Sequence, residues 1–203
     1  MNTEADLRLA ETKLSQLDPQ LAALIVARPP IALPVERDYF YALCRSIIGQ
    51  QVSLASASAI FGRLEAATQL DPAAVIGLTD EAARTIGLSG QKTAYLRDLA
   101  RHFVDHSDAY DHLSQSPDEA VISELTLIKG IGVWTAQMFL MFTLRRPDVF
   151  ALDDIGLQRA MMRLYGWETL PNKLTLGKTA DRWRPYRTVA ALYLWDSLEN
   201  TPA

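Results

Sequence analysis

The stretch of sequence that decides the fold lies in the second half of the chain and reads Leu125-Thr126-Leu127-Ile128-Lys129-Gly130-Ile131-Gly132-Val133-Trp134-Thr135-Ala136. One helix is predicted to end near Leu127 and the next to begin at Val133, so two glycines and one apolar residue must turn the chain. Glycine adopts the left-handed and close-approach conformations that so tight a turn requires. Ile131, between the glycines, is apolar and is expected to point inward and fix the turn to the core.

The same turn is a candidate anion-binding site. The amides that follow Gly130 lie at the start of a helix, where the first backbone N–H groups have no acceptor within the helix. Such a helix N-terminus binds a phosphate without any side-chain charge. The two glycines alone are equally compatible with a plain glycine-rich turn between helices, so the surrounding sequence must decide between the two interpretations.

Helical periodicity dominates the rest of the chain. Near the N-terminus, apolar residues recur at the spacing of an amphipathic helix at Leu7, Ala10, Leu14 and Leu17. Asp71-Pro72 is typical of a helix start, with a capping residue before a proline at the first helical position. Helices are predicted over residues 39–49, 54–67, 80–85, 91–106, 120–127, 133–144, 154–164 and 180–197, and one strand-like piece over 148–150. The sequence therefore predicts an all-α bundle.

Composition excludes several classes of protein. The 203 residues are 49% hydrophobic and 22% charged, which is typical of a globular domain and not of a disordered or fibrous chain. No run approaches the roughly 18 apolar residues of a membrane span, and the N-terminus lacks the pattern of a secretory signal. Cys44 is alone, which excludes an internal disulfide and an all-cysteine zinc or iron–sulfur site. We therefore expect a soluble, cytoplasmic protein.

The net charge of −4 argues mildly against a nucleic-acid partner, because such domains usually carry a basic excess. It does not decide the question. A phosphate site built from backbone amides adds no formal charge to the chain.

An acidic pair downstream can return to the hairpin. Asp154 follows Gly132 by 22 residues. A helix over 133–144 carries the chain roughly 18 Å away, at about 1.5 Å per residue, and the stretch 145–152 can span up to about 27 Å. The chain can therefore begin its next helix close to the hairpin. Asp153 and Asp154 both stand at that helix start, where one of them is expected to act as the N-cap.

With these motifs, the chain resembles the helix-hairpin-helix DNA glycosylases, and more specifically their 3-methyladenine DNA glycosylase II branch. Two positions depart from the family pattern: Lys129 stands where a proline is usual, and Ala151-Leu152 stands where a proline is common. Five blocks in the family's order carry the resemblance and together span roughly residues 39–195; they are 45–53, 86–96, the hairpin, 148–157 and 183–195.

The resemblance implies a fold of two helical lobes that face a cleft. The middle lobe would cover roughly residues 36–143 and contain the helix-hairpin-helix motif at 119–144. The second lobe would combine residues 1–35 with 145–203. The stretch before Val35 looks helical, so the extra N-terminal β domain of some relatives is expected to be absent.

The resemblance also implies a reaction, with Asp154 as the catalytic residue and Asp153 as the competing candidate. Cleavage of an N-glycosidic bond develops positive charge on the sugar, which a fixed carboxylate stabilises. A base alkylated at a ring nitrogen already carries positive charge and leaves readily, so one aspartate is enough. The expected enzyme removes bases of the 3-methyladenine and 7-methylguanine type from duplex DNA. Relatives that also cut the backbone form a Schiff base with a lysine at the position of Trp134, so no lyase activity is expected and the product is an abasic site.

Further site residues follow from the family pattern. A base must be flipped out of the duplex into a pocket, and aromatic rings suit a cationic base. The candidate pocket residues are Trp134, Trp195, Met138, Tyr39 and Phe40, for which core packing is the alternative. In the turn Gly49-Gln50-Gln51, Gln51 is the expected wedge that fills the gap in the duplex, with Gln50 beside it. The phosphate-binding hairpin would comprise Lys129, Gly130, Ile131, Gly132, Val133 and Thr135, and further DNA contacts would be Lys92, Arg45 and Arg187.

No cofactor and no side-chain metal site are expected, although the family implies a Na⁺ or K⁺ ion at the hairpin carbonyls. We expect a monomer that binds duplex DNA and no membrane. One alternative is a non-catalytic helix-hairpin-helix module that binds DNA or a protein, and another is a helical scaffold unrelated to nucleic acid. Asp154 together with Trp134 and Trp195 favours the enzyme, because a binding module needs neither a catalytic acid nor two aromatic rings that line a base pocket.

Overall fold

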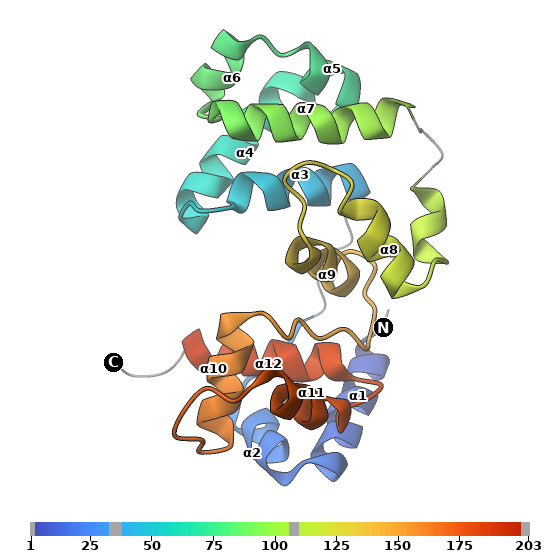
Figure 1. Cartoon of the computed structure of the whole chain (residues 1–203), viewed down its shortest axis with the longest axis vertical. Helices are drawn as coiled ribbons and strands as arrows, with labels where there is room; N and C mark the ends of the chain where they lie inside the picture. Colours follow the sequence, from blue (N-terminus) through green and yellow to red (C-terminus); the bar gives the residue numbers. More distant parts are fainter. Residues whose placement is uncertain (1–2, 33–37, 106–109, 200–203) are drawn as a thin grey trace. The chain divides into compact units, whose positions relative to one another are not determined.

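The computed structural model of the chain describes residues 3–32, 38–105 and 110–199, which form helices and contain no strand (Figure 1). The predicted all-α class is confirmed. No helix in these ranges is long and apolar enough to cross a membrane. The chain divides into two compact units, unit 1 (residues 1–35 and 140–203) and unit 2 (residues 36–139). The division falls inside α9 (Val133–Phe142), four residues before the predicted end of the middle lobe at 143. The cleft between lobes stays a prediction.

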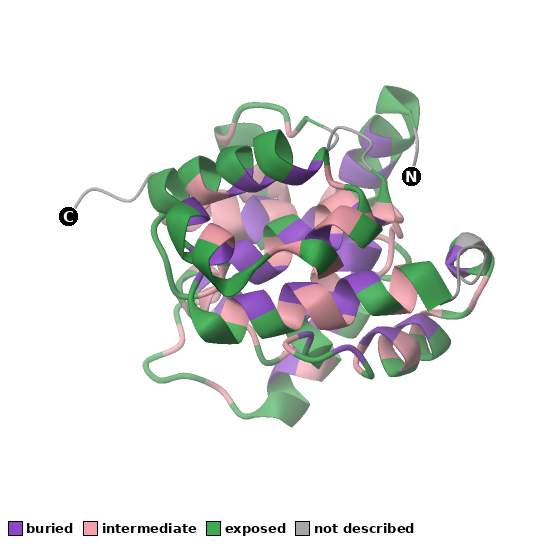
Figure 2. Cartoon of the chain, turned by 90° about the horizontal axis from the view of Figure 1, so that it is seen from above, coloured by how far each residue is buried: buried purple, intermediate pink, exposed green. Residues whose placement is uncertain are grey.

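Unit 2 is built around one long central helix, α7 (Gly90–Asp105), which packs against α3, α5 and α6. Its inner positions Leu96 and Leu99 are buried and belong to the core that Figure 2 marks in purple. The other elements of the unit are α3 (Tyr39–Gly49), α4 (Leu54–Thr68), α5 (Pro72–Gly77), α6 (Asp80–Ile86), the 3-10 turn η1 (Asp111–Ser114), α8 (Asp118–Leu125) and the first part of α9. Short polar side chains start several of these helices; Asp38, for example, accepts the amide N–H of Tyr41 at 2.7 Å.

Unit 1 brings the two ends of the chain together. Its elements are α1 (Glu4–Leu17), α2 (Pro19–Ala27), α10 (Ile155–Leu164), α11 (Lys173–Asp181) and α12 (Arg187–Glu199). Helix α12 packs against α1, α2 and α10, so the C-terminal helix forms the centre of the unit. Trp183 and Tyr193 are among its largest fully buried side chains. The two N-terminal helices are therefore part of the core that supports α10 and α12.

Two predicted elements differ from the structure. The single helix expected over 180–197 is two helices, α11 and α12, because Pro185 between them has no N–H to continue a helix. The expected strand over 148–150 does not form. Asp148 instead accepts from the guanidinium of Arg187 (2.7 Å), and the amide of Val149 donates to the hydroxyl of Thr188 (3.0 Å). Side chains from the first turn of α12 therefore bond the backbone groups of Asp148 and Val149 that a neighbouring strand would otherwise have bonded. The helix predicted over 91–106 ends at Asp105, and His106 lies outside the described residues.

A buried carboxylate fastens the helices of unit 1 to one another. Asp18 is 2% exposed and caps α2, where it accepts the amide of Leu21 at 3.2 Å. Its other oxygen accepts the indole N–H of Trp183 at 3.0 Å and the hydroxyl of Tyr165, and Arg182 lies 3.5 Å away. Burial alone would raise the pKa of Asp18, but these hydrogen bonds and the charge of Arg182 outweigh it, so its pKa lies below the ordinary value.

Unit 1 should therefore lose stability in acid. The pKa of Asp18 is lower in the folded than in the unfolded protein, so the ionised carboxylate adds to the free energy of unfolding. This contribution is complete above the pKa of the unfolded state, about 3.9, and is lost as the pH falls through the pKa of the folded state. Asp18→Asn removes the charge and should cost about 2 kcal/mol at pH 7, or roughly 4–8 °C in the melting temperature. Thermal unfolding is followed by circular dichroism from pH 7 to pH 3. The difference in melting temperature between wild type and Asp18→Asn should shrink as the pH falls below about 4. Exposed Glu168→Gln serves as control, and equal melting temperatures of wild type and Asp18→Asn at pH 7 would refute the role.

Candidate functional site

The turn between α8 and α9 requires one of its two glycines. Gly130 has a φ of 87°, and a Cβ at this position would lie 2.3 Å from the ring of Tyr95. Both the backbone conformation and the close approach of Tyr95 therefore demand glycine. Gly132 has no positive φ, and a Cβ there would meet no atom within 4 Å. The predicted glycine requirement holds at Gly130 and is wrong at Gly132.

The start of α9 reaches the surface as an amide-lined helix end. Ile131 is 4% exposed, which confirms that it points inward, and its amide donates to the carbonyl of Ile128 at 3.1 Å. The first bond of the helical ladder runs from the amide of Ala136 to Gly132 O at 3.0 Å, so the amide of Val133 has no acceptor within the helix. Val133 is 54% exposed and the side chain of Thr135 is buried. An anion can therefore be bound there by backbone N–H groups, without the Thr135 hydroxyl.

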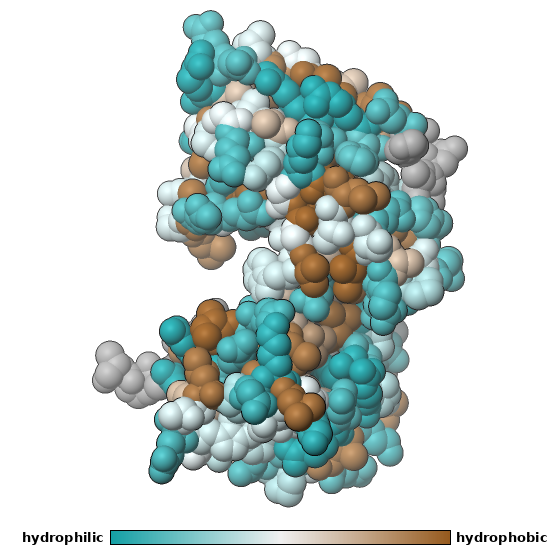
Figure 3. Space-filling model, in the orientation of Figure 1, coloured by the Kyte–Doolittle hydropathy of each residue, from teal (hydrophilic) through white to brown (hydrophobic). Residues whose placement is uncertain are grey.

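Exposed apolar side chains flank this helix end, with Leu127 72% exposed before it and Val133 54% exposed at its start. Figure 3 shows apolar side chains (brown) at the surface of the protein, and in unit 2 the exposed ones include Leu127 beside the hairpin. Lys129 is the nearest cation in sequence. Its backbone N–H donates to Asp98 Oδ2 at 2.9 Å, and its Nζ lies 3.5 Å from Oδ1 of the same carboxylate. A proline at this position would lack that N–H, so Asp98 anchors the turn through a bond that the usual family residue cannot make.

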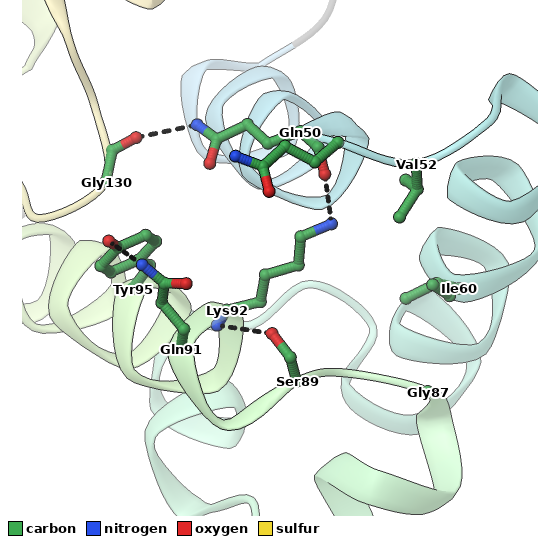
Figure 4. A pocket seen from close by; sticks show the side chains of 10 residues that line it. Gln50, Val52, Ile60, Gly87, Ser89, Gln91, Lys92, Tyr95 and Gly130 are labelled. Atoms are coloured by element: carbon green, nitrogen blue, oxygen red, sulfur yellow. Dashed lines mark hydrogen bonds between the residues drawn. The ribbon is translucent and has the colours of Figure 1, made fainter.

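The turn after α3 is tied to the hairpin through Gln50. Its amide Nε2 donates to the carbonyl of Gly130 at 2.8 Å, and its side chain points toward the hairpin in Figure 4. Gln51, the next residue, is exposed and has a φ of 57°. Lys92, predicted as a DNA contact, donates instead to the carbonyls of Ile48 (2.6 Å) and Gln50 (2.7 Å) at the end of α3. This ammonium group therefore caps a helix, and its contact with DNA stays a prediction.

A pocket of about 520 Å³ in unit 2 brings several predicted site residues together. It is lined by Arg45, Ser46, Gly49, Gln50, Gln51 and Trp134. Trp134 is 47% exposed, so its ring is accessible at the mouth of the pocket. The guanidinium of Arg45 also lies 5.6 Å from the ring centre of Phe61, a cation–π distance. The wedge turn and one of the two predicted ring walls therefore share one surface of unit 2.

In unit 1 the predicted catalytic acid is held by two N–H donors. Asp154 is the N-cap of α10, and its Oδ1 accepts the amide of Leu157 at 2.8 Å. The same oxygen accepts the indole N–H of Trp195, from α12, at 3.2 Å. The cap and the candidate catalyst are thus one residue. Asp153 is 70% exposed and forms an ion pair with Lys173.

Gly156 makes the contact between the acid and the indole sterically feasible. A Cβ at this position would lie 2.9 Å from Asp154 Oδ1 and 3.4 Å from Trp195 Nε1. The indole is held from its other side by Phe142, whose ring is stacked on it at 6.2 Å. Gly156 is not among the predicted site residues. Its signal is a glycine in the first turn of a helix, where alanine would be about 1 kcal/mol more favourable.

One family description matches most of the chain. It is that of the HhH-GPD superfamily base excision DNA repair proteins, and it covers residues 44–185. The chain belongs to this superfamily. The match confirms the resemblance that the hairpin and the downstream acid block indicated.

Individual members of the HhH-GPD superfamily are similar over most of the chain. The putative DNA-3-methyladenine glycosylase YfjP of Bacillus subtilis is 31% identical over 188 residues, which cover 88% of this chain and 66% of that protein. The crystal structure of DNA-3-methyladenine glycosidase from Bacillus halodurans has a TM-score of 0.83 and 38% identity, over 94% of this chain and 89% of that one. The Schizosaccharomyces pombe 3-methyladenine DNA glycosylase Mag1 in complex with abasic DNA has a TM-score of 0.80 and 29% identity, over 94% and 96%.

Several predicted site residues of this HhH-GPD protein have other partners. Arg187 is 17% exposed and bound to Asp148, so it fastens α12, and its contact with DNA stays a prediction. Phe40 is 5% exposed and packs edge-to-face on Phe103 at 5.1 Å, which assigns it to the core of unit 2 and not to a pocket wall.

Tyr39 and Met138 are the other predicted pocket residues of unit 2. Tyr39 packs edge-to-face on Phe139 at 5.2 Å, and Met138 is half-buried. Within the described ranges, no group of three or more His, Cys, Asp and Glu residues is placed to hold a metal ion.

Alanine at position 130 should destabilise unit 2. The added Cβ would overlap the Tyr95 ring and sit at a φ that L-residues disfavour, which together should cost about 2–4 kcal/mol and lower the melting temperature by roughly 4–16 °C. Gly132→Ala is the matched control and should change stability by less than about 0.5 kcal/mol. Differential scanning calorimetry measures both. A Gly130→Ala variant as stable as Gly132→Ala would contradict the packing described here.

Proposed function

We propose that this protein is a monofunctional DNA glycosylase that excises alkylated bases of the 3-methyladenine type from duplex DNA and leaves an abasic site. The observation that carries the proposal is the carboxylate of Asp154, held at the start of α10 by the Leu157 amide and the Trp195 indole. The names of the similar proteins, which include three 3-methyladenine glycosylases or glycosidases, one of them bound to abasic DNA, support the same activity.

The chemistry follows from the fixed negative charge. When the bond between C1′ and the base nitrogen breaks, its electron pair leaves with the base and positive charge develops on the sugar. A carboxylate that is already oriented stabilises that charge without reorganising. Water then bonds to C1′ and loses a proton, which Asp154 can accept. Because an alkylated base is already cationic, it needs no second acid to protonate it as it leaves.

Unit 2 supplies the groups that would bind the DNA. The amide-lined start of α9 suits a phosphate. Gln51, exposed in the turn between α3 and α4, would fill the gap of a flipped nucleotide. The accessible ring of Trp134 suits a cationic base through cation–π attraction. Position 134 carries an indole and no amine, so no Schiff base forms there and no strand cleavage is expected.

Asp154→Asn should abolish most base excision. The amide keeps the size of the side chain but removes the charge, and loss of one electrostatic stabiliser should lower the single-turnover rate roughly 100- to 1000-fold. The measurement is free 3-methyladenine and 7-methylguanine released from methylated duplex DNA. Asp153→Asn, one residue away and at the surface, should release base at the wild-type rate. Equal release by wild type and Asp154→Asn would eliminate the proposed catalyst.

Gly156→Ala should slow base excision without weakening DNA binding, because it displaces the acid and leaves the DNA-binding residues in place. The new Cβ would displace Asp154 Oδ1 or Trp195, and a misplacement of this size should slow excision roughly 10- to 100-fold, with DNA affinity unchanged. Since alanine is the better helix former, the helix itself should not be lost. Gly62→Ala, in the interior of α4 with no atom within 4 Å of the added Cβ, is the control. Wild-type excision rates in Gly156→Ala would show that the close approach is not required.

A further inference from the structure

We propose that four residues, Gln50, Lys92, Tyr95 and Asp98, form a brace that locks the wedge turn (residues 49–51) to the phosphate-binding hairpin (residues 128–133). The two would then act as one rigid unit during base flipping. The proposal rests on the proposed function, in which the turn fills the duplex and the hairpin holds a phosphate. All four residues and both segments belong to unit 2.

Lys92 fixes the base of the wedge turn. Its ammonium group donates to two carbonyls at the end of α3, those of Ile48 and Gln50, across 44 and 42 residues of sequence. A cation at a helix C-terminus satisfies carbonyls that have no partner within the helix and complements the helix dipole. Burial also lowers the pKa of Lys92, as expected for an ammonium group enclosed by protein. The last turn of α3 is thereby attached to α7.

Gln50 connects the wedge turn directly to the hairpin. Its side chain donates to the carbonyl of Gly130, so it is occupied within the protein, while its own carbonyl accepts from Lys92 (Figure 4). Gln51 is left as the exposed residue of the pair, and its backbone is left-handed, with a φ of 57°. Gln50 therefore ties the turn to the hairpin, and Gln51 is the residue left to act as the wedge.

Helix α7 holds the hairpin at two further points. The ring of Tyr95 lies so close to Gly130 that no side chain fits there, and its hydroxyl accepts from Gln91 at 2.6 Å. Asp98 accepts the backbone N–H of Lys129. Lys92, Tyr95 and Asp98 follow one another at intervals of three, which are neighbouring positions on a helix surface. One helix thus positions both the wedge turn and the hairpin.

The brace has a mechanical consequence. To flip a nucleotide, the wedge must enter the stack while the phosphate beside it stays in place, and unstacking the base costs free energy. A turn that could yield relative to the hairpin would relax away from the duplex instead of opening it. Loss of the brace should therefore impair flipping in an intact duplex, and should affect neither phosphate binding nor the chemical step at a base that is already unstacked.

The test uses the full chain with Gln50→Ala and Lys92→Met, and Arg101→Met on the exposed side of α7 as the matched control. Two duplexes carry the same alkylated base, one opposite its normal partner and one opposite an abasic analogue, where flipping costs least. Both brace variants should lose roughly tenfold or more in single-turnover excision from the paired duplex, and at most about twofold from the duplex with the abasic analogue. A loss of equal size on both duplexes, or no loss on either, would overturn the brace.

A second measurement reads flipping without excision. The fluorescence of 2-aminopurine placed beside the target base rises when the stack opens. Wild type and Arg101→Met should give the rise, and the brace variants should bind the DNA with wild-type affinity but give a reduced rise. A full rise in Gln50→Ala and Lys92→Met would refute the brace. A wild type that opens the stack but releases no base would refute the proposed glycosylase and leave the flipping result to decide on the brace.

Discussion

The position of the Asp154 carboxylate is the constraint that the helices of unit 1 have to meet. A half-buried acid must be both stabilised as an anion and kept in one orientation, and here the amide of Leu157 and the indole of Trp195 do both from different helices. Their geometry holds only if α10 and α12 keep their spacing. The ion pair of Arg187 with Asp148 fixes the start of α12, and Gly156 keeps the space between the acid and the indole open.

The acidic net charge of this DNA-repair family member has a structural explanation. Of the cations that the sequence suggested as DNA contacts, Lys92 donates to backbone carbonyls and Arg187 to Asp148, so both serve the fold. Lys129 lies beside Asp98. The hairpin offers backbone amides at the start of α9, which bind an anion through partial charges that no count of lysines and arginines includes. A chain of charge −4 can therefore still present a phosphate site.

The sequence predicted what local rules determine. Helical periodicity gave the all-α class, and the apolar residue between two glycines gave the inward Ile131. The rules failed where a partner is distant in sequence: the contact of Asp98 with Lys129 spans 31 residues, and those of Lys92 span more than 40. No pattern along the chain shows which carbonyl a long flexible side chain will meet after folding. The break at Pro185 was foreseeable from proline chemistry, because a proline has no N–H to continue a helix.

Under the proposed function, Trp195 couples the shape of the base pocket to catalysis. Its N–H edge is bonded to Asp154, and its face is stacked on Phe142. A ring that is fixed at its edge and across its face cannot be moved to admit a larger base without also moving the acid. A substitution that moves Trp195 to widen the pocket should therefore also displace the carboxylate and slow the reaction.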